Sequence, residues 1–369
     1  MNDQLSALDY ATRILRYDQP SKDTVDTLRA EILAGQPDWG NIVGLVNHHL
    51  LTPAMWLALN KKALIDELPV DLAAYLHDLY QLNCERNHQL RNQLLEAVRQ
   101  LNHNGIIPVL LKGAKHLVTE IYSGPGARIM TDIDLLVRQE DITSSLDSLI
   151  ELGYEPVEDK HGDYHEEHHH CSPMFRSGAY GAIEIHRRLA EYPYELILPT
   201  ELVLAETEPL IVEQAHMRVL TPTHRILHNI VHSQLIDHLH DNGTIPLRSL
   251  HEVYCEQAAY SSHIDWAMIS RQMNNNKRGR VLRAYLFMMK TLYGSPSSSE
   301  ARPTLAAHLY YQRCRAQLAW RKAHEWGLRY GRYSPDMLND QYGYGRGWGA
   351  TFRSRMRRLA EKLSEILVH

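Results

Sequence analysis

Two carboxylates, separated by one residue in an apolar run, are the strongest candidates for chemistry in this sequence. Asp132 and Asp134 stand in the segment IMTDIDLLV, residues 129–137, whose composition predicts a buried β-strand. Residues i and i+2 of a strand face the same way, so the two carboxylates should project side by side. Like charges in apolar surroundings repel and lose hydration unless a cation lies between them, and oxygen ligands favour Mg²⁺ or Mn²⁺. An edge strand with solvated acids is the alternative, and the apolar residues 135–137 argue against it.

A second predicted strand, residues 180–186, offers the same geometry. Glu184 and His186 share one of its faces. If this strand neighbours the first, its glutamate joins the two aspartates and three carboxylates converge. Such a set suits a two-metal site for phosphoryl chemistry. Taken alone, Glu184 has the ordinary alternative of a surface acid.

Basic and glycine residues near the first acids could bind phosphate. Lys112 and Gly113 follow a predicted strand at 106–111 and precede a predicted helix at 115–122. A helix N-terminus with a close-approaching glycine backbone and a lysine is suited to phosphate groups. Arg128 could neutralise phosphate charge. The alternatives are an ordinary strand–helix turn and basic residues on the surface.

The pattern of the whole chain predicts how these residues are positioned. Apolar spacing predicts helices in residues 1–104, including segments at 69–82 and 90–101, and again from about residue 222. Between them, short apolar strands alternate with helical segments, one of them closing at Gly153. This alternation predicts a sheet flanked by helices.

The composition is that of a soluble globular protein, since 44% of the 369 residues are hydrophobic and 22% are charged. No run of about 18 apolar residues and no secretory signal occur, so we expect no membrane partner. Four separated cysteines without a CxxC pair favour a reducing cytoplasm. The formal charge of −5 is uneven: residues 301–369 carry 13 Lys and Arg against 5 Asp and Glu, or +8, and residues 1–300 carry −13.

The order of these motifs resembles a known family. LLKGAKHLVTEIY, a Gly/Pro loop, ARIMTDIDLLV, a helix ending in ELGY, and IEIH occur in turn. The series, over roughly residues 80–260, resembles the uncharacterised bacterial nucleotidyltransferases of the DNA polymerase β-like superfamily. Two departures are Ala114, where the superfamily usually has a serine after the glycine, and Arg187, where the family often has an aromatic residue.

The resemblance implies a fold and a site. The fold would be α+β, with a small mixed-sheet nucleotidyltransferase core at 105–215 embedded between a helical region at 1–104, a second at 216–300 and a basic, mainly helical segment at 301–369. The implied metal-binding and catalytic acids are Asp132, Asp134 and Glu184. The residues expected to contact the bound nucleotide are Lys112, Gly113, Arg128 and His186.

The predicted activity is Mg²⁺-dependent (or Mn²⁺-dependent) transfer of an NMP group from an NTP to a hydroxyl of a small-molecule, peptide or protein acceptor. Pyrophosphate is released, and Glu184 helps to deprotonate the acceptor. One alternative is transfer to RNA, as by a tRNA-modifying toxin, which the basic segment at 301–369 favours. The other is a non-catalytic nucleotide-binding module. The acceptor, the base of the NTP and the oligomeric state are open.

Two groups of histidines are further candidates for metal binding. The patch from His161 to His170, followed by Cys171, could bind zinc, but it lacks a second pair of ligands at defined spacing. We therefore favour a solvated loop or a segment at the rim of the site, where it could contact nucleotide or acceptor. His224, His228 and His232 share one helix face, and we expect them to be packing residues.

Overall fold

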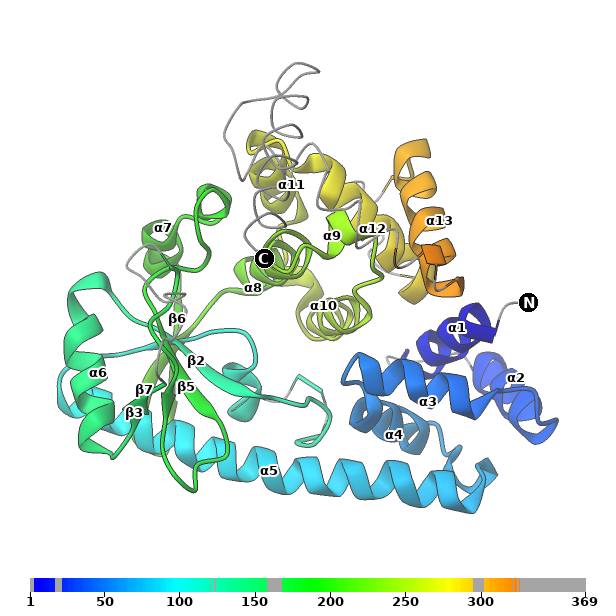
Figure 1. Cartoon of the computed structure of the whole chain (residues 1–369), viewed down its shortest axis with the longest axis horizontal. Helices are drawn as coiled ribbons and strands as arrows, with labels where there is room; N and C mark the ends of the chain where they lie inside the picture. The colour runs from blue at the N-terminus through cyan, green and yellow to red at the C-terminus, as the bar shows by residue number, and fades with distance from the viewer. Residues whose placement is uncertain are drawn as a thin grey trace, which may run out of the picture.

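The described part of the computed structural model consists of residues 3–16, 22–119, 121–122, 124–157, 168–294, 302–320, 322–323 and 325. Helices and one seven-stranded mixed sheet make up this part, so the predicted α+β fold is confirmed. The sheet lies at one end of the molecule and the helical groups lie at the other (Figure 1). Most of the basic segment at 301–369 lies outside the described residues. None of the described helices is both long and apolar enough to span a membrane.

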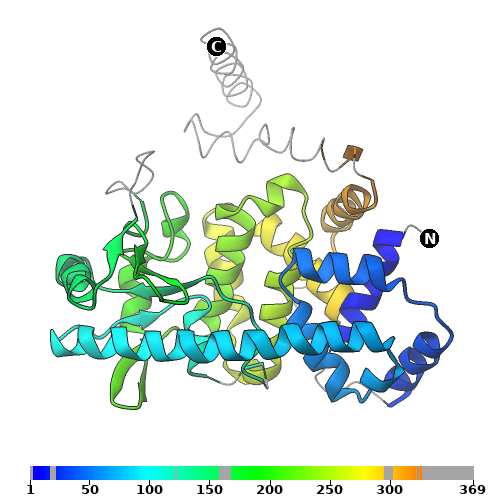
Figure 2. The same cartoon turned by 60° about the horizontal axis from the view of Figure 1, so that its bottom comes forward.

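The N-terminal part is helical, as predicted. Its helices are α1 (Asp3–Leu15), α2 (Lys22–Leu33), α3 (Trp39–His48), α4 (Thr52–Lys61) and α5 (Val70–His103), with a 3-10 turn at Ile65–Glu67. The segments predicted at 69–82 and 90–101 belong to one continuous helix, α5, of 34 residues. Helix α5 runs beneath both the N-terminal helices and the sheet in Figure 1, and in Figure 2 it crosses in front of them.

Buried polar side chains of α5 hold the loop that precedes the first acidic strand. The amide of Asn83 donates hydrogen bonds to the carbonyls of Gly126 and Arg128, at 2.7 and 3.0 Å, and Asn87 donates to Pro125 and Arg128, at 2.7 and 2.9 Å. Gly126 is needed at this contact, because a Cβ there would lie 2.7 Å from the backbone oxygen of Tyr80. The long helix therefore positions this loop directly.

The sheet has the order β3-β4-β5-β2-β1-β7-β6. The pairs β2–β5 and β1–β7 are parallel and the remaining pairs are antiparallel. The predicted strands at 129–137 and 180–186 correspond to β2 and β5. The strands are β1 (Val109–Leu110), β2 (Asp132–Leu136), β3 (Glu155–Pro156), β4 (Met174–Phe175), β5 (Ala182–His186), β6 (Glu208–Val212) and β7 (Ala215–Val219).

The structure corrects two predictions around β1. The strand predicted at 106–111 is paired as a ladder only at Val109–Leu110, because Pro108 has no N–H and Lys112 turns the chain with a φ of +41°. The helix predicted at 115–122 is wrong: a four-residue 3-10 turn, Ala114–Leu117, stands in its place. The side chain of Lys115 is buried against Glu256, and this tertiary contact overrides the local helical pattern.

The remaining helices flank the sheet or complete the helical half. Those flanking the sheet are α6 (Ile142–Glu151) and α7 (Thr200–Ala205), with 3-10 turns at Gln139–Asp141 and Tyr194–Leu196. The helical half contains α8 (Pro222–Val231), which continues into a π-turn at His232–Ile236, α9 (Leu239–Asn242), α10 (Leu247–Tyr260), a 3-10 turn at Ser261–His263, α11 (Trp266–Asn275), α12 (Gly279–Tyr293) and α13 (Leu305–Ala319).

Two apolar clusters hold these elements together. One packs the sheet against α5 and α6 and includes Leu94, Ile133 and Ile185. The larger one joins α1, α3 and α4 with α8, α10 and α12, and it reaches the sheet through Leu136. The acidic strand β2 thus contributes to both clusters, which places it at the junction between the sheet and the helical half.

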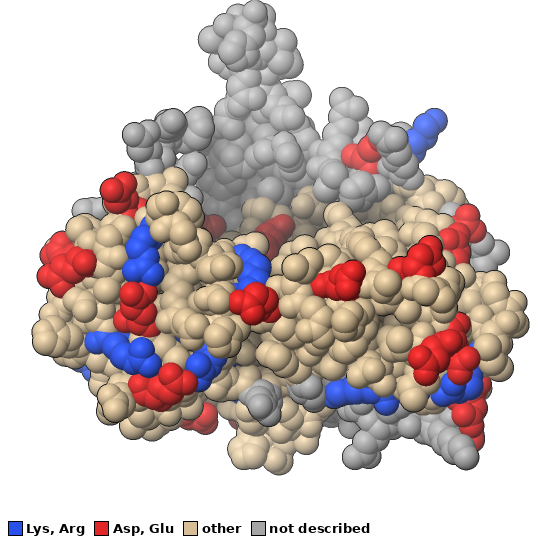
Figure 3. Space-filling view, turned by 90° about the horizontal axis from the view of Figure 1, so that it is seen from below, with Lys and Arg blue, Asp and Glu red and all other residues tan. Residues whose placement is uncertain are grey.

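The surface of the α5 side mixes charges of both signs. Figure 3 shows acidic and basic side chains interspersed among other residues on this face. Arg91 and Arg99, for example, both pair with Glu213, at 2.8 and 3.4 Å. The described part of this face therefore presents no extended field of one sign.

Buried neutral histidines should make the folded state sensitive to acid. Burial lowers the pKa of His228 to about 3 and the pKa of His251 to about 4. The unfolded chain binds these protons below about pH 6.5, so the free energy of unfolding should fall between pH 6.5 and 4, by up to about 1.4 kcal/mol per pH unit for each histidine. Urea unfolding at several pH values measures this slope.

The variant His251→Gln should show a smaller slope than wild type between pH 6 and 4. Above pH 7.5 these histidines are neutral in both the folded and the unfolded state. The free energies of unfolding of the two proteins should therefore change with pH in the same way there. A wild-type free energy of unfolding that stays constant down to pH 4.5 would contradict the assignment.

Candidate active site

The pairing of β2 and β5 brings the predicted acids together. The two strands run parallel, with Asp134 directly opposite Glu184 and Asp132 opposite Ala182. The condition under which the sequence predicted that the carboxylates converge, namely that the two acidic strands are neighbours, is met. One ligand atom each from Asp134, Glu184 and His186 lies within 4.8 Å of the others, so these three side chains could hold one metal ion. Asp132 lies on the same strand face but outside this group of three.

Asp134 is a fully buried carboxylate with its charge compensated on one oxygen. The Nζ of Lys112 donates to Oδ1 at 2.8 Å, and the Nε2 of His186 approaches the same oxygen at 2.9 Å. Burial alone would raise the pKa of Asp134, but Lys112 and His186 hold it well below its ordinary value. The other oxygen, Oδ2, has no hydrogen-bond partner among the described residues.

His186 links the two acidic strands. Its Nε2 lies 2.9 Å from Asp134 Oδ1 and 3.5 Å from Glu184 Oε2. Although burial opposes protonation, the hydrogen bonds to these two carboxylates raise the pKa of His186. The same contact lowers the pKa of Glu184 against the effect of its burial. The imidazole thus holds both carboxylates in place and stabilises their ionised forms.

Asp132 has different surroundings. It is half-buried and lines a cavity of about 270 Å³ between the sheet and helices α8 and α10. Burial and the neighbouring charges of Asp134 and Glu184 raise the pKa of Asp132. The predicted crowding of carboxylates is therefore present. It raises the pKa of Asp132, the acid that lines the cavity.

Lys112 and Gly113 lie at the same cavity, although the predicted helix behind them is absent. The ammonium group of Lys112 pairs with Asp134, so it compensates a carboxylate here. Gly113 allows Arg128 to pass closely, because a Cβ at residue 113 would lie 2.1 Å from the Nη1 of that arginine. Arg128 is in turn held by Glu252 of α10, with its Nε 3.0 Å from Oε1.

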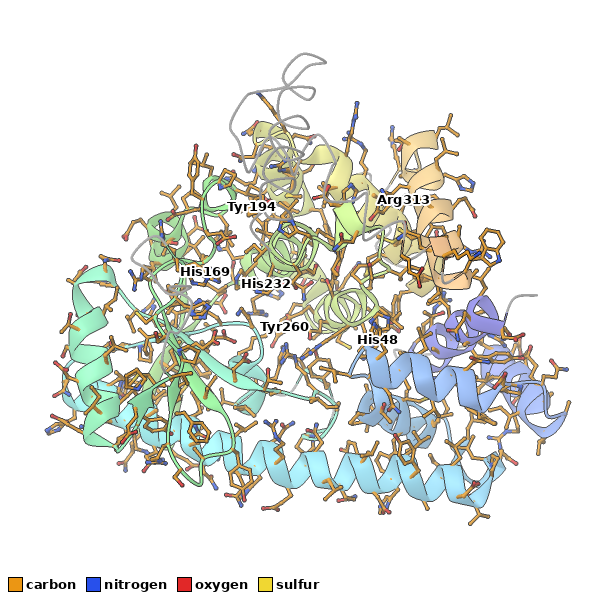
Figure 4. The ribbon with its side chains drawn as sticks, in the orientation of Figure 1. His48, His169, Tyr194, His232, Tyr260 and Arg313 are labelled. Carbon is orange, nitrogen blue, oxygen red and sulfur yellow. The ribbon has the colours of Figure 1, made fainter. Side chains whose placement is uncertain are left out.

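The cavity is lined by five basic and four acidic side chains. Sequence reasoning identified three of the nine: Lys112, Arg128 and Asp132. It missed the others, which are Lys115, Arg225, Asp237, Arg248, Glu252 and Glu256. Figure 4 labels His232, which lines the cavity from the end of α8. Such a lining suits a ligand that carries several negative charges and also donates hydrogen bonds.

Two acids of α10, the buried Glu256 and the half-buried Glu252, hold the basic groups in place. Glu256 binds Lys115 and also Arg225, whose Nη2 lies 3.0 Å from Oε2. Glu252 binds Arg128 and Arg248, at 3.0 and 3.2 Å. The spacing of Arg248, Glu252 and Glu256, at i, i+4 and i+8, places them on one helix face, and this was the signal available in the sequence.

The histidine patch reaches the site only in part. His161 and His165 lie outside the described residues. His170 forms an antiparallel bridge with His186, and its Nε2 lies 3.9 Å from Glu184. The described part of the patch therefore lies at the rim of the acidic site, one of the positions that the sequence predicted. His224 and His228 are buried in α8, as expected for packing residues.

The chain belongs to the family of uncharacterised nucleotidyltransferases, which matches residues 35–294. This range includes every residue of the candidate site. No curated protein and no solved structure matches the chain. Family membership supports a transferase that acts in nucleotidyl transfer in general, with an NTP as substrate. The predicted resemblance is confirmed for the family, and its place in the DNA polymerase β-like superfamily stays a prediction.

Removing one acid of the buried ion pairs should destabilise the fold. Glu256→Gln leaves Lys115 and Arg225 without their shared countercharge in a buried setting, and we expect a loss of about 3–5 kcal/mol in the free energy of unfolding. Urea unfolding measures the loss. The exposed Glu140, whose partner Arg138 is 3.9 Å away, provides the control Glu140→Gln, which should leave stability unchanged. Equal stability of the two variants would refute a structural role for Glu256.

A methyl group at residue 113 should disturb the cavity wall. Gly113→Ala forces Arg128 away from its position and should cost about 1–3 kcal/mol in the free energy of unfolding. The matched control is Gly44→Ala in α3, where a Cβ meets no atom within 4 Å, and where alanine should stabilise by about 0.5–1 kcal/mol. The same urea experiment compares them, and effects of the same sign would contradict the close approach.

Proposed function

We propose that this protein transfers an NMP group from an NTP to a hydroxyl acceptor, using Asp132, Asp134 and Glu184 to bind Mg²⁺ or Mn²⁺. The observation that carries the proposal is the register of β2 and β5, which sets Asp134 opposite Glu184 beside a cavity lined by five basic and four acidic side chains. Family membership supplies the reaction class. We also propose that the family is part of the DNA polymerase β-like superfamily.

The acidic residues fit a divalent cation. Asp134 Oδ2 is a buried carboxylate oxygen without a hydrogen-bond partner among the described residues, and Glu184 lies across from it. Oxygen donors of this kind are the ligands that Mg²⁺ and Mn²⁺ prefer. When bound, the ion would neutralise charge on the triphosphate and make the acceptor hydroxyl more acidic.

The basic residues of the cavity wall would bind the triphosphate. Lys112 lies between the acids and the cavity, where it compensates Asp134. A bound cation would take over that compensation and leave the ammonium group for a phosphate oxygen. Arg128, held in place by Glu252, would contribute a second fixed positive charge. Both assignments follow the sequence prediction for these two residues.

His186 has a positioning role in this proposal. Its side chain is 1% exposed and its Nε2 is shared between Asp134 and Glu184. It was grouped with the nucleotide-contacting residues on the sequence alone. The contacts favour a role in holding the two carboxylates, with no direct contact to the nucleotide.

The proposed reaction forms one bond, breaks one bond and transfers one proton. The acceptor oxygen forms a bond to the α-phosphorus, the bond from the α-phosphorus to the bridging oxygen breaks, and pyrophosphate leaves. In this proposal Glu184 receives the proton of the acceptor hydroxyl, and its lowered pKa is consistent with an ionised carboxylate near neutral pH. The chain thus supplies cation ligands, triphosphate contacts and a proton acceptor at one place.

Nucleotide binding gives the first test. With Mg²⁺ and an NTP at about 100 times its Kd, wild type should gain about 2.7 kcal/mol of stability, seen as a higher melting temperature. Asp134→Asn and Glu184→Gln should lose this gain and all transfer activity, while Asp147→Asn, an exposed acid of α6, should keep both. A Mg²⁺-dependent gain that survives in both site variants would refute the assignment of the acids.

The position of a radioactive label then identifies the transferred group. Label from an α-phosphorus of the NTP should enter the acceptor, whereas label from the γ-phosphorus should leave with pyrophosphate. Sensitivity of the labelled product to nuclease or protease separates an RNA acceptor from a protein one. For RNA, binding should also weaken steeply with salt, because phosphate contacts release counterions.

A further inference from the structure

A second cluster of metal-binding side chains lies next to the acidic site and shares no residue with it. One ligand atom each from His168, His169 and Glu191 lies within 4.8 Å of the others. We propose that these three side chains bind a zinc ion. The proposal is independent of the nucleotidyl-transfer reaction and concerns a site with a different donor set.

The surroundings of His169 point to a ligand. Its residue exposure is 6%, and its Nδ1 has no hydrogen-bond partner among the described residues. A buried ring nitrogen without a partner is unfavourable, and a metal ion would satisfy it. Figure 4 shows His169 on the side of the sheet that faces the helical half of the molecule.

The backbone holds the cluster together before any ion binds. The amide groups of Arg187 and Arg188 both donate to the carbonyl of His169, at 3.0 and 3.2 Å, and Cys171 donates to Ile185 at 2.9 Å. The histidine segment is therefore attached to the end of β5. Glu191 follows in the loop that leaves the same strand. The three ligands thus come from two segments that are already joined by hydrogen bonds.

The donor set favours zinc over magnesium. Two imidazoles and one carboxylate are common zinc ligands and leave a fourth position open, whereas Mg²⁺ prefers oxygen donors. A tetrahedral zinc ion separates its ligand atoms by about 3.3 Å, a separation below the 4.8 Å limit within which the ligand atoms of this cluster lie. The acidic site, with two carboxylates and one histidine, has the opposite balance.

The sequence shows no second pair of zinc ligands at defined spacing, and three consecutive histidines such as His168 to His170 cannot all point at one ion from a strand. In the structure the three histidines do not share one candidate ion site, but His168 and His169 do. The rings of His168 and His169 are stacked, with centroids 4.6 Å apart and planes at 24°, while the ring of His170 turns edge-on and approaches Glu184. Glu191, twenty-two residues after His169, supplies the third ligand.

Zinc retention by the untagged, full-length chain tests the proposal. The protein is dialysed against Zn²⁺ in the presence of excess Mg²⁺, and bound zinc is counted by atomic emission. Wild type should retain zinc, and Glu191→Gln and His169→Ala should lose it. The zinc affinity of each variant should be at least tenfold weaker than that of wild type. Asp134→Asn should retain it, because the acidic site is separate, and Glu201→Gln, an exposed acid of α7, should behave as wild type.

Three results would overturn the site: no zinc on wild type, full retention by Glu191→Gln, or loss from Asp134→Asn alone. Equal melting temperatures of wild type and Glu191→Gln in a chelator show that the variant folds, so a loss of zinc then reports the ligand itself. Nucleotide binding is measured with Mg²⁺ and without zinc. The zinc result and the nucleotide result can therefore be interpreted separately, even if one of the two proposals fails.

Discussion

An ionised carboxylate that is fully buried needs positive charge or hydrogen-bond donors around it. Asp134 is such a carboxylate. The turn after β1 supplies Lys112, and β5 supplies His186. Each of these contacts depends on a strand pairing: β1 with β2 in one case and β2 with β5 in the other. The order of the three central strands is therefore tied to the compensation of a single charge.

The same requirement recurs at the helical side of the cavity. Glu256 is buried and Glu252 is half-buried in α10, and each binds two basic side chains, of which Lys115, Arg128 and Arg225 come from other elements. Buried pairs of this kind contribute little net stability compared with apolar packing, but they are costly to break. Their effect is to fix basic groups around a polar space, which an apolar core cannot do. Gly113 contributes by leaving room for one of the arginines.

Local patterns predicted the acidic strands well, because a period of two fixes which residues share a face. Asp132, Asp134 and Glu184 were found in this way, and the family resemblance implied that the three acids form one metal-binding set, whereas the pairing of their strands is seen only in the structure. The hairpin of β6 and β7 was missed, since its turn at Glu213 and Gln214 takes positive φ without glycine or asparagine. The short turn at Ala114–Leu117 and the cluster of His169 with Glu191 depend on contacts between distant segments. Such contacts leave no periodic trace in the sequence.

The length of α5 limits how this protein can move. At 34 residues it is a rod of about 51 Å that is packed against the sheet at one end and against α4 at the other. A hinge between the sheet and the N-terminal helices would have to bend this rod, and its hydrogen bonds to the loop before β2 would transmit the strain to the acids. Among the described residues, no long helix joins the sheet to α8 and α10 on the two sides of the cavity, and side-chain ion pairs such as Arg128 with Glu252 and Lys115 with Glu256 connect them there. Opening and closing of the molecule around a substrate should therefore be a change in the width of that cavity, with the acids carried on the stiff side.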